Sequence, residues 1–149
     1  MKKSRRIKPV ARLALSREQQ AIQELGSRQR HLRQQQEQLA QLVTYKLEYQ
    51  KQLQEKGSSG MSAAQFQDMQ CFLNKLDKAV VQQKAQIQLA SQACEQTRLA
   101  WVDAHARTQA LETVVSRYHQ EEQQEISRRE QKEMDERAHL RSEQYPVKE

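Results

Sequence analysis

The two cysteines and four histidines of this sequence are its best candidates for metal ligation or nucleophilic catalysis. Cys71 and Cys94 belong to no CxxC pair and have no histidine at ligand spacing. The histidines are scattered among polar residues, at His31, His105, His119 and His139. The sequence also contains no HExxH, no glycine-rich phosphate loop and no G-x-S-x-G. We therefore expect no catalytic site, no metal and no cofactor, and we expect that the protein is not an enzyme.

The composition is typical of long helices rather than of a compact globule, with three glycines and two prolines among 149 residues. The formal net charge of +6 at pH 7 favours an acidic partner surface but is too modest to require nucleic acid. No apolar run approaches the ~20 residues that span a bilayer, and Arg12 interrupts the short apolar run near the N-terminus, which argues against a secretory signal. Cys71 and Cys94 lie turns apart on one predicted helix and cannot bridge each other, so we expect a reduced, cytoplasmic setting.

Residues 66–118 carry a heptad pattern that indicates a long helix in need of a helical partner. Apolar and small side chains recur at alternating steps of three and four, without Gly or Pro. One narrow apolar stripe has no core of its own, so it must pack against another helix. The stripe comprises Phe66, Met69, Leu73, Leu76, Val80, Gln83, Ile87, Ala90, Cys94, Thr97, Trp101, Ala104, Thr108, Leu111, Val115 and Tyr118.

A weaker stripe precedes this one and begins after Pro9, a residue that fits the first turn of a helix. Its apolar members are Val10, Leu15, Ile22, Leu25, Leu32, Leu39, Leu42, Tyr49 and Leu53, and Gln29, Gln36 and Lys46 fall on the same face. Gly57-Ser58-Ser59-Gly60 is the one place where Gly and Ser cluster, which predicts a turn. Ser62 and Gln65 then form a capping box that opens the second helix.

Two helices joined by so short a turn must run antiparallel. The sequence therefore predicts an all-α fold, an antiparallel two-helix coiled-coil hairpin with a longer, overhanging C-terminal helix. We expect a flexible basic arm over residues 1–9, a coiled-coil helix over 10–56, the turn over 57–61, a long helix over 62–142 and a tail over 143–149. Folding about Gly60 sets Val10 level with Leu111, so the second helix overhangs beyond about Tyr118. Mixed charges fill that overhang, which indicates a single helix held by i,i+4 pairs or one awaiting a partner.

A second set of residues lies beside the seam rather than in it. Tyr45, Phe72 and Ala79 are each one position away from a seam residue. The antiparallel register sets members of the two helices level with one another: Gln38 with Gln83, Leu42 with Ala79, Tyr45 with Leu76, and Tyr49 with Phe72. An exposed patch of aromatic and apolar residues on a thin helical hairpin is typical of a docking surface. The alternative is a broader core closed by a kinked helix or by a second copy of the chain. The candidate partner-binding residues are Gln38, Leu42, Tyr45, Tyr49, Phe72, Leu76, Ala79 and Gln83.

These stripes, the turn and the C-terminal segment resemble the FliJ family of flagellar export proteins. The resemblance covers most of the chain at dispersed positions. It is carried by Gln38-Leu39 through Leu42, Tyr45, Glu48-Tyr49 and Leu53, then by Gln70, Phe72, Leu76, Lys78-Ala79 and Gln82, by Trp101, and by Gln131-Lys132-Glu133-Met134-Asp135-Glu136.

The resemblance implies a stalk-like adaptor of the flagellar type III protein export apparatus. Its partners would be a hexameric flagellar export ATPase, the cytoplasmic part of the export gate membrane protein, and flagellar export chaperones that it escorts. It would be a cytoplasmic protein, peripheral at the cytoplasmic face of the inner membrane, without a membrane span of its own and without bound nucleic acid. The family implies gate docking through the eight candidate residues, and a histidine of the family corresponds to Gln83, which keeps a polar contact but does not titrate. The basic opening of this sequence departs from the family pattern.

Two other interpretations stay open at this point. A basic coiled coil could bind nucleic acid or a ribosome through residues 2–33, and the steep salt dependence of phosphate contacts would reveal it. The chain could instead form a generic homodimeric coiled coil without a turn at Gly60, which would give a rod nearly twice as long.

Overall fold

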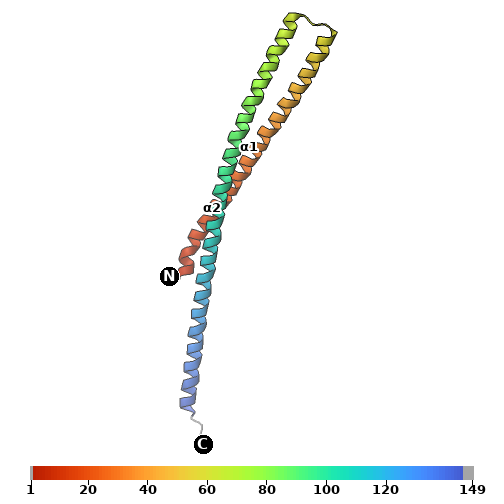
Figure 1. The fold of residues 1–149 in the computed structure, drawn as a ribbon. Coiled ribbons are helices and arrows are strands. Elements are labelled where there is room, and N and C mark those ends of the chain that lie inside the picture. The colour runs from red at the N-terminus through yellow and green to blue at the C-terminus, as the bar shows by residue number, and fades with distance from the viewer. Residues whose placement is uncertain (1, 146–149) are drawn as a thin grey trace. The chain divides into compact units, whose positions relative to one another are not determined.

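The computed structural model describes residues 2–145, which form two long α-helices with no strand among them. Helix α1 runs over Lys3–Ser59 and helix α2 over Ala63–Gln144. The chain reverses direction between them, so α1 and α2 pack as an antiparallel pair (Figure 1). The predicted all-α hairpin with the longer helix second is confirmed. Neither helix is long and apolar enough, over the residues described, to cross a membrane.

Contacts divide these residues into two compact units. Unit 1 combines the residues up to Gln19 with those from Asp103 onward, and unit 2 is Gln20–Val102. Each unit therefore pairs one stretch of α1 with one stretch of α2. Because neither stretch has an apolar face broad enough to fold alone, each unit is stabilised by the seam between its two helices.

The break between the helices is shorter than predicted, since α1 continues through Gly57 to Ser59 and only residues 60–62 are non-helical. Gly60 ends the helix with a φ of 95°, a conformation that glycine adopts without a Cβ clash. The backbone N–H of Gln65 donates to the Ser62 hydroxyl at 3.2 Å, which caps the N-terminus of α2 as the sequence predicts. The turn therefore has the residues that its backbone requires.

Unit 2 buries a seam close to the predicted one. Leu25 and Leu53 of α1 and Leu76 and Ala90 of α2 are its buried apolar residues. Along α2, every predicted seam position from Met69 to Trp101 is buried or half-buried. Phe66 is the exception: it is 45% exposed because it lies in the first turn of α2, where α1 is ending.

The N-terminal part of the predicted α1 seam is wrong. Val10, Leu15 and Ile22 are exposed, and so are Gln29 and Gln36. When heptad positions are counted back from the buried Leu25 at steps of four and three, they fall one residue away from Val10, Leu15 and Ile22. The buried or half-buried residues of this stretch are Ser4, Ile7, Ala11, Ala14, Glu18 and Ala21.

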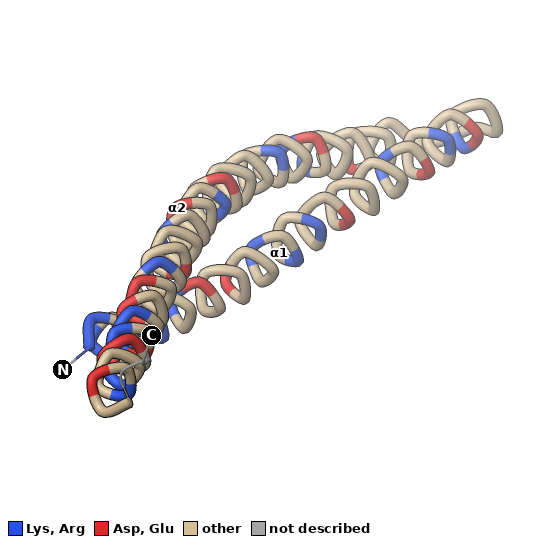
Figure 2. The backbone as a smooth tube through the Cα atoms, turned by 90° about the horizontal axis from the view of Figure 1, so that it is seen from below, with Lys and Arg blue, Asp and Glu red and all other residues tan. Residues whose placement is uncertain are grey.

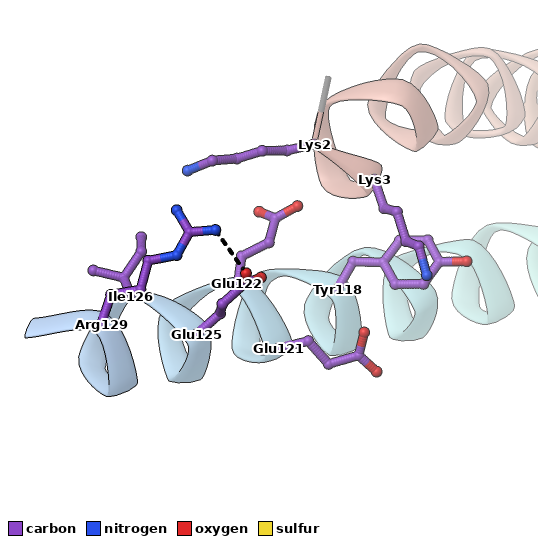
Figure 3. Close-up of a pocket in the computed structure, with 8 residues that line it drawn as sticks. All are labelled: Lys2, Lys3, Tyr118, Glu121, Glu122, Glu125, Ile126 and Arg129. Atoms are coloured by element: carbon purple, nitrogen blue, oxygen red, sulfur yellow. Dashed lines mark hydrogen bonds and ion pairs between the residues drawn. The ribbon is translucent and has the colours of Figure 1, made fainter. Parts of the chain in front are cut away.

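In unit 1, the start of α1 is held against α2. The Ser4 backbone N–H donates to Glu122 Oε1 at 3.1 Å, and the Ser4 hydroxyl donates to Oε2 at 2.6 Å. One carboxylate of α2 thus satisfies a free N–H in the first turn of α1, where the helix dipole also favours a negative charge. Lys3 Nζ lies 5.6 Å from the centre of the Tyr118 ring (Figure 3).

Residues 3–9 are consequently helical and do not form the flexible basic arm that we expected. Pro9 lies inside α1 rather than at its first turn. A proline there removes one backbone hydrogen bond and crowds the preceding turn. The contacts of Ser4 with Glu122 offset part of that cost, and they are tertiary contacts between residues 118 apart in sequence.

A second polar contact crosses the seam of unit 1. His105 Nδ1 lies 2.6 Å from Glu18 Oε1, and the Glu18 side chain is 16% exposed. Hydrogen bonds from His105 and from the nearly buried Thr108 hold the pKa of Glu18 below its usual value. Glu18 therefore stays ionised in the seam because two neighbours stabilise its charge.

Beyond Glu122, all described residues of α2 are exposed, so the helix continues without a partner. The paired region ends slightly later than the predicted Tyr118, because α1 begins at Lys3 rather than near Val10. Side-chain pairs one turn apart support the unpaired segment: Glu125 with Arg129 at 2.9 Å, and His139 with Glu143 at 3.2 Å. Acidic and basic residues are intermixed along α2 (Figure 2). Residues 146–149 of the predicted tail lie outside the described residues.

A pair of glycine substitutions tests the turn. Gly60→Ala places a Cβ on a residue with positive φ and should lower the free energy of unfolding by about 1–2 kcal/mol. Gly57→Ala adds the same methyl group to a helical residue and should raise it by about 0.5–1 kcal/mol. Neither Cβ would meet another atom within 4 Å, so packing does not complicate the comparison. Chemical denaturation followed by circular dichroism measures both, and equal effects would contradict the turn geometry.

The seam carboxylates predict an acid-sensitive fold. The Ser4 hydroxyl and then its backbone N–H lower the pKa of Glu122, as His105 and Thr108 lower that of Glu18. A carboxyl with a lowered folded-state pKa stabilises the fold above its unfolded pKa, and this contribution is lost as the pH falls through the lowered value. The double variant E18Q/E122Q should therefore melt below the unmodified protein at neutral pH, and the gap should close in acid.

Thermal melts from about pH 7 to about pH 3 measure this gap. The control is Glu130→Gln in the exposed part of α2, which should melt like the unmodified protein at every pH. A gap for E18Q/E122Q that stays constant with pH would show that these carboxylates do not stabilise the fold through their charge.

Candidate docking surface in unit 2

All eight candidate binding residues lie in unit 2, four on each helix. The turn at Gly60 fixes the antiparallel register, and the register brings the two sets level with one another. Gln83 lies 3.4 Å from Gln38, as predicted. The ring of Tyr49 likewise meets the ring of Phe72, its predicted neighbour. The structure thus brings the sequence-predicted residues together across the two helices.

Three aromatic rings form the centre of this surface. The Phe72 ring centre lies 4.8 Å from that of Tyr49, with the rings tilted by 59°. It lies 6.3 Å from that of Tyr45, at 84°, in an edge-to-face contact. We predicted Tyr45 opposite Leu76, so the Tyr45–Phe72 contact is an addition to the expected pairing. Tyr45 is 49% exposed and Phe72 37% exposed, so their outer faces are available to a partner.

The other candidate binding residues differ in how exposed they are. Gln38 is exposed, whereas Leu42, Tyr49, Ala79 and Gln83 are half-buried. Leu76 is only 8% exposed and belongs to the core of the seam. Leu76 therefore offers little surface of its own to a partner.

The Gln83 amide joins the two helices. Its Nε2 donates to the backbone carbonyl of Gln35 at 2.9 Å and to Gln35 Oε1 at 2.8 Å. Sequence reasoning missed Gln35, because it assigned Gln36 to the seam. Gln35 lies seven residues before Leu42 and is half-buried, so carrying the correct heptad frame back from Leu42 would have found it.

An ion pair between Lys46 and Asp77 joins the helices in the same region. Both side chains remain partly exposed to water, so this pair contributes little to stability but adds to the register. The surface as a whole offers aromatic faces bordered by amides, which suits an apolar or aromatic side chain of a protein partner. Within residues 2–145, no group of three His, Cys, Asp or Glu side chains is placed to hold a metal ion.

Comparison with known proteins gives consistent family matches. The family model of the flagellar FliJ protein matches residues 2–144. The chain is 30% identical to the flagellar FliJ protein of Escherichia coli K12 over 124 residues, covering 83% of this chain and 84% of that protein. It is also 30% identical to the flagellar FliJ protein of Salmonella typhi over 112 residues, covering 75% of this chain and 76% of that one.

No solved structure matches the chain significantly. The family match extends over almost all of both helices, and the two relatives are covered over most of their length. The chain therefore belongs to the flagellar FliJ protein family.

Proposed function

We propose that the protein is a stalk-like adaptor of the flagellar type III protein export apparatus. In this role it links a hexameric export ATPase to the cytoplasmic part of the export gate membrane protein. Membership of the FliJ family is the observation that carries the proposal. Two long helices packed as an antiparallel pair suit a part that transmits contacts between larger components.

The aromatic surface of unit 2 supports the gate-binding part of this role. Tyr45 and Phe72 keep much of their area exposed although they contact each other. Interfaces derive most of their binding energy from a few aromatic residues of this kind, surrounded by groups that exclude water. Gln38 and Gln83 provide such a polar border, and Leu76 is buried in the seam of the same unit.

The unpaired end of α2 supports the ATPase-binding part. Residues 123–144 are exposed and have no helical partner in unit 1, and they carry intermixed charges of both signs. An isolated helix in water is only marginally stable, so contact with a partner would stabilise this segment. Insertion into an ATPase ring would give it a partner. Export chaperones are a further class of partner for this adaptor, which would work in the cytoplasm and at the cytoplasmic face of the inner membrane.

The double substitution Y45A/F72A tests gate docking. Each ring should contribute roughly 2 kcal/mol or more if it lies at the centre of the interface, so the pair should weaken binding about a thousandfold. Titration calorimetry against the cytoplasmic part of the gate protein measures this loss, and circular dichroism should show unchanged helicity.

The matched control for that test is L47A/V81A. Both residues are exposed apolar side chains of unit 2 outside the docking surface, at 60% and 67%. This variant should bind the gate like the unmodified protein. If Y45A/F72A retained full affinity, the docking surface would be assigned wrongly.

Removal of residues 123–149 tests the ATPase contact. The seam of both units remains, so the melting temperature should stay within a few degrees of the full chain. Co-purification with the hexameric export ATPase should be lost. A second variant replaces residues 123–144 with a Glu/Lys/Ala helix of equal length, and binding by this variant would show that the contact needs a helix rather than this sequence. Unchanged co-purification of the truncated chain would exclude the overhang as the ATPase contact.

A further inference from the structure

A groove between α1 and α2 in unit 1 is distinct from the aromatic surface of unit 2. It encloses about 400 Å³. Two of its residues are among the exposed large apolar side chains of the protein, Val10 at 49% and Leu13 at 52%. The groove is lined by Val10, Leu13, Ala14, Arg17, Asp103, Ala104, Arg107, Ala110 and Leu111.

The shape of the groove follows from its residue types. The half-buried Ala14 and Ala104 are too small to fill the floor between the helices, whereas the exposed Val10 and Leu13 have larger side chains that project further. On α1 the spacing of four, three and four residues places Arg6, Val10, Leu13 and Arg17 on one helical face. That face presents two apolar side chains with an arginine on either side of them.

The surrounding charge is positive. From residue 2 to residue 17, α1 and the residue before it carry seven Lys or Arg and no Asp or Glu. Among the residues lining the groove, Asp103 is the one acid, and it is paired with Arg107 at 3.6 Å. Among the described residues, no carboxylate lies within ion-pair distance of Arg17. The groove thus combines apolar walls with uncompensated positive charge.

We propose that this groove binds an amphipathic helix with acidic flanks, supplied by a protein partner. A third helix laid along two antiparallel helices inserts a ridge of side chains between them, and small residues on the floor permit that approach. Arg6 and Arg17 are eleven residues apart, or about 16 Å along α1. The partner is therefore a helix of about three turns, with apolar residues at i, i+3 or i+4, and i+7, and with Asp or Glu at each end.

The features of the groove favour a protein helix over other anionic partners. A flat bilayer surface does not fit a concave floor of alanines, and proteins that bind single-stranded nucleic acid stack bases on aromatic rings, of which the lining has none. The proposal also stands apart from the adaptor role, because it concerns the isolated chain and needs neither the ATPase nor the gate. Loss of either of those contacts would leave it untouched.

Two hydrocarbon-stapled peptides provide the test. Both are helices of about four turns with the same leucine stripe, and they differ in having Glu or Lys at the flanking positions. Fluorescence anisotropy with the full chain should show at least about tenfold tighter binding of the acidic peptide, and the difference should shrink as salt screens the charges. Equal affinity for both peptides would overturn the proposal.

Two pairs of matched variants locate the site. R6E/R17E reverses the arginines on the groove face, and R5E/R12E makes the same change of charge about 100° around the same helix. The first should weaken acidic-peptide binding about tenfold or more, and the second by about threefold at most. Leu13→Asp should likewise weaken it about tenfold, whereas Leu89→Asp, at an exposed leucine of unit 2, should not. Circular dichroism verifies that each variant is folded.

The remaining outcomes contradict the proposal in distinct ways. Equal losses for R6E/R17E and R5E/R12E would indicate general attraction to polyanions. Binding to vesicles of phosphatidylglycerol, with R6E/R17E weakening it more than R5E/R12E, would assign the groove to a lipid surface. Sedimentation that shows a dimer dissociated by Leu13→Asp would assign it to a second copy of the chain.

Discussion

The structure depends on burial along one seam. Two helices without a third layer can exclude water only where their facing side chains meet, and few of residues 2–145 are buried. Each seam contact therefore counts for a larger share of stability than it would in a globule. This constraint explains why the helices are so long and why Ser4, Glu18 and Gln83, polar residues of the seam, each have a hydrogen-bond partner on the other helix.

Those polar partners hold the register that the turn at Gly60 sets. Gln83 binds Gln35 in unit 2, and Glu18 meets His105 in unit 1. An all-apolar seam can slide by a heptad with little loss of burial, but a buried amide or carboxylate loses its partner when it slides. In unit 2, the register that the Gln83–Gln35 contact holds also sets Tyr45, Tyr49 and Phe72 next to one another. Accurate register and a defined aromatic surface thus have a common physical origin.

The sequence predicted α2 better than α1 for a reason that lies in side-chain size. The α2 seam carries Leu73, Val80 and Ile87, whose size makes the heptad visible. In the first part of α1 the seam is made of residues such as Ala11, Ala14 and Ser4, while larger apolar residues lie outside it. A prediction that places the large apolar residues in the seam therefore assigns the wrong face of α1 there. Of the apolar residues wrongly assigned to the seam, Val10 lines the groove of unit 1, where it lies beside Leu13.

The candidate site was predictable because its position depends only on the turn and the register. Gly60 and the capping box of Ser62 and Gln65 indicate both in the sequence. The start of α1 was not predictable, since it depends on Glu122, a residue 118 positions away, and a basic segment with a proline reads locally as an arm. For Leu76, the sequence predicted a position beside the docking surface. It did not predict that the side chain would be buried, because burial depends on packing.

The two hydrogen bonds between Ser4 and Glu122 have a consequence for the kinetics of folding. A hairpin whose helices meet at Gly60 can associate outward from that end, since contacts close in sequence require the least loop entropy. Each pair of residues that forms then shortens the loop that the next pair must close, and the contact between Ser4 and Glu122 forms last. The order reverses on opening, so amide hydrogens near the beginning of α1 should exchange with solvent well before those beside the reversal of the chain. Partners that approach from the termini would thus encounter the more readily opened part of the protein.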